Sequence, residues 1–89
     1  MNDSNVNVFK ALADPTRLDI VRKLASSTKP ISGCDIVSDC SALSQPAMSH
    51  HFTKLVDASV ITEQKKGTEK IYELNYDLFA TVGIDPSKI

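Results

Sequence analysis

The spacing of apolar residues changes once along this chain of 89 residues, near Val60, and that change limits the folds it can adopt. Before Val60, apolar residues recur every three or four positions, which is the period of an amphipathic helix. After it, segments 61–65 and 70–74 bracket Lys66-Gly67-Thr68-Glu69, a pattern typical of a β-hairpin with glycine at the bend. The sequence therefore predicts a mainly α fold, with about four to five helices and a two-stranded β-hairpin.

Asp14-Pro15 separates the first two predicted helices. The first covers about residues 5–13, and the second runs from Pro15 to the polar segment 26–30. Asp14 can cap the second helix, and Pro15 suits its first position because the missing N–H has no helical partner there. The predicted apolar stripes are Val6, Phe9, Leu12 and Ala13 in the first helix, and Leu18, Val21, Leu24 and Ala25 in the second.

Two further helices are predicted before the hairpin. The third starts near Ser32, and the fourth runs from an N-cap at Ser44 to about Ser59. We expect Ile36, Val37 and Cys40 to be buried from the third helix, and Met48, Phe52, Leu55 and Ser59 from the fourth.

The outward face of the fourth helix carries short polar side chains, a composition that suits contact with base edges in a DNA groove. The hairpin tip is rich in lysines, whose ammonium groups can reach phosphates. An amphipathic helix with an ordinary solvated face is the alternative explanation. The candidate DNA-binding residues are Ser44, Gln45, Pro46, Ser49, His50, Thr53 and Lys54 on the helix, and Lys65, Lys66, Thr68 and Lys70 on the hairpin.

The first helix and a short last helix hold more apolar residues than one small core needs. We therefore predict a symmetric homodimer, held by Val6, Phe9, Leu78, Phe79 and Val82. On the hairpin, Tyr72 and Leu74 share one face and should pack on the helices.

Composition fits one soluble domain over residues 1–89, with 42% hydrophobic and 24% charged residues. No apolar run approaches the ~20 residues of a membrane span, and no secretory signal is visible, so a cytoplasmic location without membrane contact is expected. Net charge is −1, and residues 44–70 form the most basic stretch. We find no catalytic constellation and expect no enzyme.

Two long motifs resemble the ArsR/SmtB family of winged helix-turn-helix regulators. Residues 9–24 (Phe-Lys-Ala-Leu-Ala-Asp-Pro-Thr-Arg-Leu-Asp-Ile-Val-Arg-Lys-Leu) are similar to the family's opening, residues 43–55 to its recognition helix, and Gly67–Asn75 to its wing. The resemblance implies a dimeric repressor of operator duplex DNA that is released by an effector, which the sequence leaves unknown. It also implies groove contacts from Ser44, Gln45, Pro46, Ser49 and His50.

The metal-site positions of that family are only partly occupied. Where metal-sensing members carry Cys-x-Cys, this chain has Ser32-Gly33-Cys34, and no histidine follows His51. We therefore expect no metal site and no cofactor. Cys34 and Cys40 remain either packing residues or sensor thiols, and a disulfide between them requires the third helix to end before Cys40.

Two alternatives to a simple repressor stay open at this stage. One is a winged-helix module for protein–protein contact, which a net charge near zero would suit. The other is a repressor that responds to thiol oxidation or to a metal.

Overall fold

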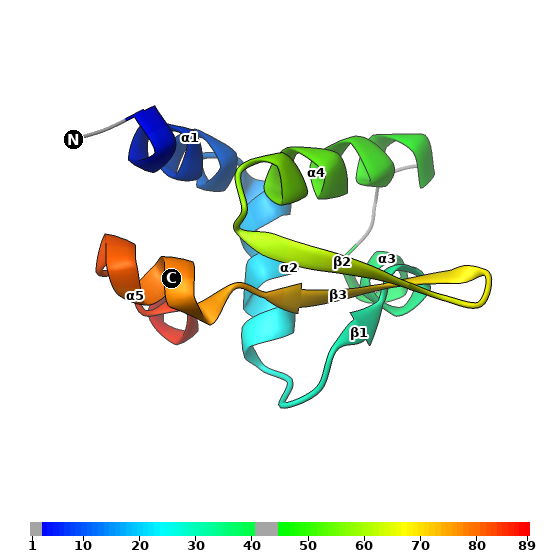
Figure 1. The fold of residues 1–89 in the computed structure, drawn as a ribbon. Helices are drawn as coiled ribbons and strands as arrows, with labels where there is room; N and C mark the ends of the chain where they lie inside the picture. Colours follow the sequence, from blue (N-terminus) through cyan, green and yellow to red (C-terminus); the bar gives the residue numbers. More distant parts are fainter. Residues whose placement is uncertain (1–2, 41–44) are drawn as a thin grey trace.

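The computed structural model describes residues 3–40 and 45–89 (Figure 1). The predicted order of helices and hairpin is confirmed, whereas Ser44, the expected N-cap, lies outside the described residues. No helix in the described ranges is long and apolar enough to cross a membrane. The elements are α1 (Asp3–Leu12), α2 (Pro15–Ala25), β1 (Ile31–Ser32), α3 (Gly33–Cys40), α4 (Gln45–Asp57), β2 (Ile61–Lys66), β3 (Glu69–Leu74), α5 (Tyr76–Val82) and the 3-10 helix η1 (Pro86–Lys88).

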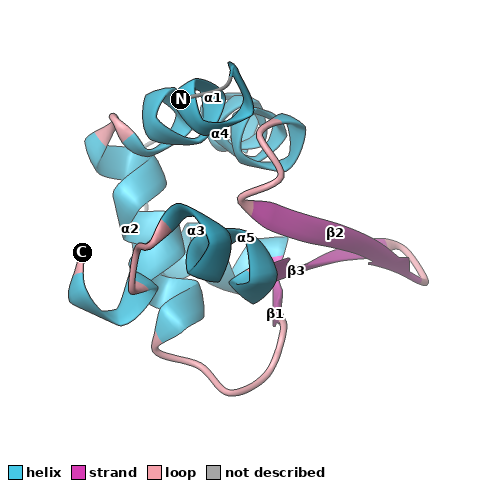
Figure 2. Cartoon of the chain, turned by 60° about the vertical axis from the view of Figure 1, so that its left-hand side comes forward, coloured by secondary structure: helices cyan, strands magenta, loops and turns pink. Residues whose placement is uncertain are grey.

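Helix α2 lies at the centre and contacts α1, α3, α4, β3 and η1. Helices α1 and α4 lie together in one layer, with the sheet and α5 below them (Figures 1 and 2). The hairpin of β2 and β3 projects from the body and forms the wing. This arrangement leaves one long side of α4 exposed. The wing lies along one flank of α4, and α1 lies beside its C-terminal end.

The sheet has three antiparallel strands in the order β1-β3-β2: β2 and β3 form the predicted two-stranded hairpin, and β1 is an additional strand that the sequence pattern did not predict. Ile31 pairs with Tyr72, and Ser32 pairs with Ile71. A strand of two residues is too short to show an alternating pattern in the sequence. It forms because the edge of β3 is open for pairing. Gly33 follows at once, and a Cβ there would lie 3.2 Å from Tyr72 Cε2, so glycine permits this close approach.

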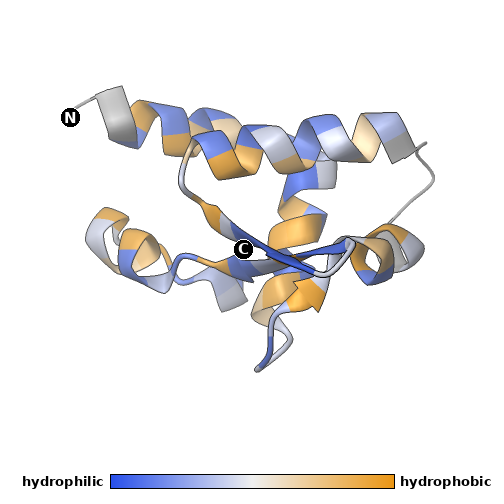
Figure 3. Cartoon of the chain, turned by 45° about the vertical axis from the view of Figure 1, so that its right-hand side comes forward, coloured by the Kyte–Doolittle hydropathy of each residue, from blue (hydrophilic) through white to orange (hydrophobic). Residues whose placement is uncertain are grey.

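The wing turns at Gly67, whose φ of 65° favours glycine. A positive φ at the first central residue of a two-residue loop is the pattern of a type II′ hairpin. At the base of the wing, Ile61, Tyr72 and Leu74 are buried, as expected for Tyr72 and Leu74. Toward the tip the wing becomes hydrophilic (Figure 3).

The core differs from the predicted stripes at the ends of two helices. In α1, Val8 and Ala11 join Leu12 in the core, whereas Phe9 is 41% exposed and Ala13 lies beyond the helix end. Ser59 is exposed at a φ of 64°, because α4 ends at Asp57 and the chain reverses. The buried residues are Val8, Ala11, Leu12, Ile20, Val21, Leu24, Ile36, Met48, Phe52, Leu55, Val60, Ile61, Tyr72, Leu74 and Phe79.

Candidate nucleic-acid interface

Helix α4 buries one side and exposes the other, as its pattern predicts. Met48, Phe52 and Leu55 are buried, and the Thr53 hydroxyl donates a hydrogen bond to the Ser49 carbonyl oxygen at 3.0 Å. Gln45 begins the helix, but its side chain is not among those described. The candidate contact residues exposed on α4 are Pro46, Ser49, His50, Thr53 and Lys54.

The four wing candidates, Lys65, Lys66, Thr68 and Lys70, are all exposed near the hairpin tip. In the strand register Lys65 lies opposite Lys70, and Lys66 lies opposite Glu69. Because side chains alternate between the faces of a strand, Lys65 and Lys70 share the face of Tyr72, which looks toward α4. Lys66 lies on the opposite face.

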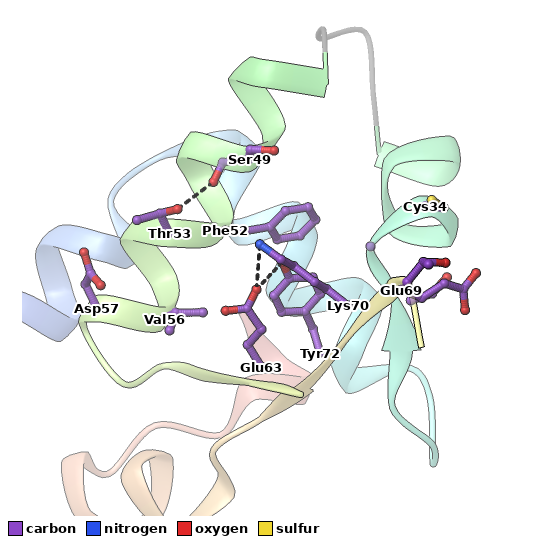
Figure 4. A pocket seen from close by; sticks show the side chains of 13 residues that line it. Cys34, Ser49, Phe52, Thr53, Val56, Asp57, Glu63, Glu69, Lys70 and Tyr72 are labelled. Carbon is purple, nitrogen blue, oxygen red and sulfur yellow. Dashed lines mark hydrogen bonds and ion pairs between the residues drawn. The ribbon is translucent and has the colours of Figure 1, made fainter. Parts of the chain in front are cut away.

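A hollow of about 540 Å³ lies between α4 and the wing, and we call it the wing-side hollow. The rings of Phe52 and Tyr72 stack within it, with centroids 4.5 Å apart and planes inclined by 12° (Figure 4). Its charged lining residues are three carboxylates and one ammonium, those of Asp57, Glu63, Glu69 and Lys70.

Glu63 binds two groups in this hollow through a single oxygen. Its Oε1 accepts a hydrogen bond from Tyr72 Oη at 3.1 Å and lies 3.4 Å from Lys70 Nζ (Figure 4). Burial, together with the negative charge of Glu63, raises the pKa of Tyr72 to about 12. Lys70, one of the candidate phosphate contacts, is therefore ion-paired with Glu63.

A second hollow, of about 320 Å³, lies on the other flank of α4 against α1, and we call it the α1-side hollow. Its charged residues are three cations and one carboxylate. Of these cations the sequence pattern indicates only Lys54 as a DNA contact, because Lys10 and Arg17 become neighbours of α4 only through the packing of α1 and α2. The hollow is lined by Asn7, Lys10, Ala11, Arg17, Lys54, Asp57 and Ala58.

Arg17 is held in place beneath the α1-side hollow. Its Nε donates to the carbonyl oxygen of Ala11, and its Nη2 donates to that of Lys10 at 3.4 Å, so the guanidinium caps the end of α1. Its Nη1 lies 3.3 Å from His51 Nδ1. These contacts fix a positive charge where α1, α2 and α4 meet.

Asp14 completes this junction as the N-cap of α2. Its Oδ2 accepts a hydrogen bond from the Arg17 backbone N–H at 3.0 Å and lies 3.7 Å from His51 Nδ1. The backbone hydrogen bond is the main cause that lowers the pKa of Asp14 below its ordinary value of 3.8. His51 is half-buried, as its position on α4 predicts.

The residues predicted to form a dimer do not all lie at the surface. Phe9 is 41% exposed, and Val6, Leu78 and Val82 are half-buried. Phe79 is only 2% exposed, so its inclusion in a dimer surface was wrong. Because adjacent helical residues point ~100° apart, Leu78 and Phe79 of the short α5 face different surroundings, and Phe79 takes the core position.

Cys34 is exposed and lines the wing-side hollow, which does not fit packing, one of the two roles left open for it. Helix α3 extends to Cys40, so the two cysteines occupy one continuous helix and the condition for a disulfide is not met. The side chain of Cys40 is not described. Within residues 3–40 and 45–89, no three His, Cys, Asp or Glu side chains gather in a group that could hold a metal ion.

Helices α3 and α4, packed on α2 and followed by a β-hairpin beside α4, define a winged helix-turn-helix protein. A family model described as "Bacterial regulatory protein, arsR family" matches residues 14–63, which include α2, α3 and α4. The chain belongs to the ArsR family.

Individual relatives agree with this assignment. The chain is 37% identical over 70 residues to an arsenical resistance operon repressor of Staphylococcus xylosus, covering 79% of this chain and 64% of the relative. It is 39% identical over 69 residues to the transcriptional repressor SdpR of Bacillus subtilis, covering 78% and 73%. The chain spans just under two thirds of the length of the arsenical resistance repressors that it matches.

The fold is also that of a solved relative. The homodimeric winged helix-turn-helix DNA-binding domain of a possible ArsR-family regulator from Mycobacterium bovis superposes with a TM-score of 0.77, covering 91% of this chain and 73% of that one. The two sequences are 22% identical.

Proposed function

We propose that this chain is a DNA-binding transcriptional repressor that acts as a homodimer in the cytoplasm and has no catalytic activity. The observation that carries the proposal is the exposed polar face of α4 beside a wing whose tip bears Lys65, Lys66 and Lys70. Its relatives in the ArsR family include proteins named as repressors, which supports the regulatory role.

Helix α4 enters the major groove, where polar side chains distinguish the four base pairs by hydrogen bonds. His50 lies near the middle of the exposed face, with Ser49 and Thr53 beside it. The family resemblance adds Ser44 and Gln45 as candidate groove contacts. The wing lysines bind phosphates, which position the protein but carry no sequence information.

The homodimer forms through α1 and α5, where the exposed Phe9 and the half-buried Val6, Leu78 and Val82 supply apolar surface. The M. bovis domain with the same fold is described as homodimeric, which supports a homodimer. Two copies would place two α4 helices on successive major grooves of one duplex. Light scattering at micromolar concentration should give the mass of two chains, and the mass of one chain would contradict the dimer.

Selecting bound sequences from a random duplex pool tests the function and supplies the operator. His50→Ala should lower affinity for that operator, by ~1–3 kcal/mol per good base contact, and leave random-duplex binding nearly unchanged. Lys66→Ala should weaken both kinds of binding and reduce the slope of log K against log salt by ~1 for each phosphate that the lysine no longer binds.

Lys88→Ala is the matched control for Lys66→Ala, because Lys88 is an exposed lysine on η1, outside α4 and the wing. If His50→Ala weakened all DNA equally, the roles assigned to α4 and the wing would be wrong. If the wild type bound no duplex, a protein-interaction module would replace the repressor as the better account.

A further inference from the structure

We propose that the α1-side hollow binds a phosphate of the DNA backbone, so that Lys10 and Arg17 act together with Lys54 in DNA binding. This inference rests on the proposed function, because it assumes that α4 lies in the major groove. It adds α1 and α2 to the DNA-binding surface, beyond the recognition helix and the wing.

A helix in the major groove has a phosphate backbone on each side. The groove is about 12 Å wide, and an α-helix with its side chains is about 10–12 Å across, so phosphates approach both flanks of the helix. The wing lies along one flank of α4. The α1-side hollow lies along the other, with Lys54 on its α4 wall and Lys10 on its α1 wall.

The charges of this hollow suit a phosphate. Lys10, Arg17 and Lys54 surround it from three different helices, and Asp57 is its single carboxylate. Lys10 and Lys54 are exposed and have no ion pair within residues 3–40 and 45–89. Their ammonium groups are therefore available to an incoming anion.

Arg17 contributes a charge that is already positioned. Three of its five N–H donors point to Ala11, Lys10 and His51, and no further hydrogen-bond partner occurs for the other two in the described part of the chain. A guanidinium held in this way loses little side-chain entropy when it binds a phosphate. The two lysines supply flexible contacts around this fixed cation.

The hollow lies on a different side of α1 from Phe9, the most exposed of the apolar residues proposed for the dimer. Asn7 lines the hollow, and Phe9 follows two residues later, about 160° around α1 at 3.6 residues per turn. A dimer formed through Phe9 therefore leaves the Asn7 side of α1 beside α4. One helix can serve both the partner and the DNA.

The test measures binding of a random-sequence duplex over a series of NaCl concentrations. The variants are Lys10→Gln, Lys54→Gln and the double variant, and the matched control is Lys29→Gln, which removes an exposed charge from the loop between α2 and β1. Each phosphate contact contributes about 0.9 to the slope of log K against log salt. In a dimer, Lys10→Gln should therefore reduce the slope magnitude by about 2, the double variant by more, and the control by nothing.

The outcomes separate this inference from the proposed function. Wild-type binding with an unchanged slope in Lys10→Gln would overturn the inference alone, whereas absence of wild-type binding would overturn both. Thermal unfolding with and without inorganic phosphate distinguishes DNA from a free anion as the ligand. If phosphate stabilised the wild type but not the double variant, and the DNA slope did not change, the hollow would be a small-anion site and the DNA assignment would be wrong.

Discussion

Two hollows flank α4, and they differ in both floor and charge. The wing-side hollow has an aromatic floor of Phe52 and Tyr72, whereas the α1-side hollow lies over the hydrogen-bonded guanidinium of Arg17. Carboxylates dominate the first hollow and cations the second. The net charge of −1 therefore conceals a strong asymmetry about the helix proposed to read DNA.

This asymmetry indicates which parts of the surface approach phosphates. A phosphate in the wing-side hollow would meet Asp57 and Glu63, which repel it, whereas Glu69 lies at the tip opposite Lys66. Lys65 and Lys66 lie nearer the tip than Glu63. We therefore infer that the wing contacts DNA through its tip, while the opposite flank of α4 offers cations close to the body of the protein.

The largest expected effect comes from removing the aromatic floor of the wing-side hollow. Phe52→Ala deletes a buried ring that stacks on Tyr72 from the wing, and such changes cost about 3–5 kcal/mol of the free energy of unfolding. Urea denaturation measures this loss. Val56→Ala, a half-buried position lining the same hollow, is the control and should cost much less. Equal losses would mean that the stack does not anchor the wing.

The Tyr72 hydroxyl should make this floor sensitive to alkali. Because the pKa of Tyr72 is raised to about 12 from 10, the folded state holds the phenol proton more tightly than the unfolded chain. The stabilisation is complete below pH 10 and is lost as pH rises toward 12, with a magnitude of up to about 2 kcal/mol. Tyr72→Phe should remove this pH dependence, measured by urea denaturation between pH 9 and 11.5. A wild type and a variant with the same alkaline profile would contradict it.

The α1-side floor should respond to acid instead. Asp14→Ala removes the N-cap of α2 and a carboxylate near Arg17 and His51, at a cost of about 1 kcal/mol. Because the pKa of Asp14 is lowered below 3.8, its stabilisation is complete above pH 3.8 and is lost as pH falls further, through the folded-state pKa. Thermal unfolding from pH 7 to pH 3 should show the two proteins converging. Asp19→Ala, an exposed position of the same helix, is the control.

The sequence could predict the elements but not these hollows. Helix periodicity and the Lys66-Gly67-Thr68-Glu69 bend locate α4 and the wing, because both patterns are local. The strand β1 and the grouping of Lys10 with Arg17 and Lys54 depend on contacts between distant segments, which no local spacing encodes. Phe79 was misassigned for the same reason, since an apolar residue on a short helix can face either the core or a partner.

Lys65 and Lys70 also show that local sequence does not reveal which charges are available to bind phosphate. Both are lysines near the tip, and they lie directly opposite each other in the hairpin. Only the structure distinguishes them, because Lys70 has Glu63 as an ion-pair partner at 3.4 Å. Charge counted along the sequence gives the two lysines equal value for DNA binding. In the structure their values differ, because Glu63 neutralises Lys70 and not Lys65.

The smallest predicted effect is an increase in DNA affinity when Glu63 is neutralised. It tests directly whether the carboxylates of the wing-side hollow oppose DNA binding. Glu63→Gln keeps an oxygen that can accept the Tyr72 hydrogen bond but removes the charge that pairs with Lys70. Random-duplex affinity should rise about two- to fivefold, because an exposed ion pair is worth at most ~1 kcal/mol and a released Lys70 can bind phosphate.

The control, Glu73→Gln, makes the same charge change on the opposite face of the hairpin and should have a weaker effect. The gain should also disappear in a Lys70→Ala background, since the two changes act on one pair. A gain that survived loss of Lys70 would show instead that Glu63 repels DNA directly, without acting through that lysine.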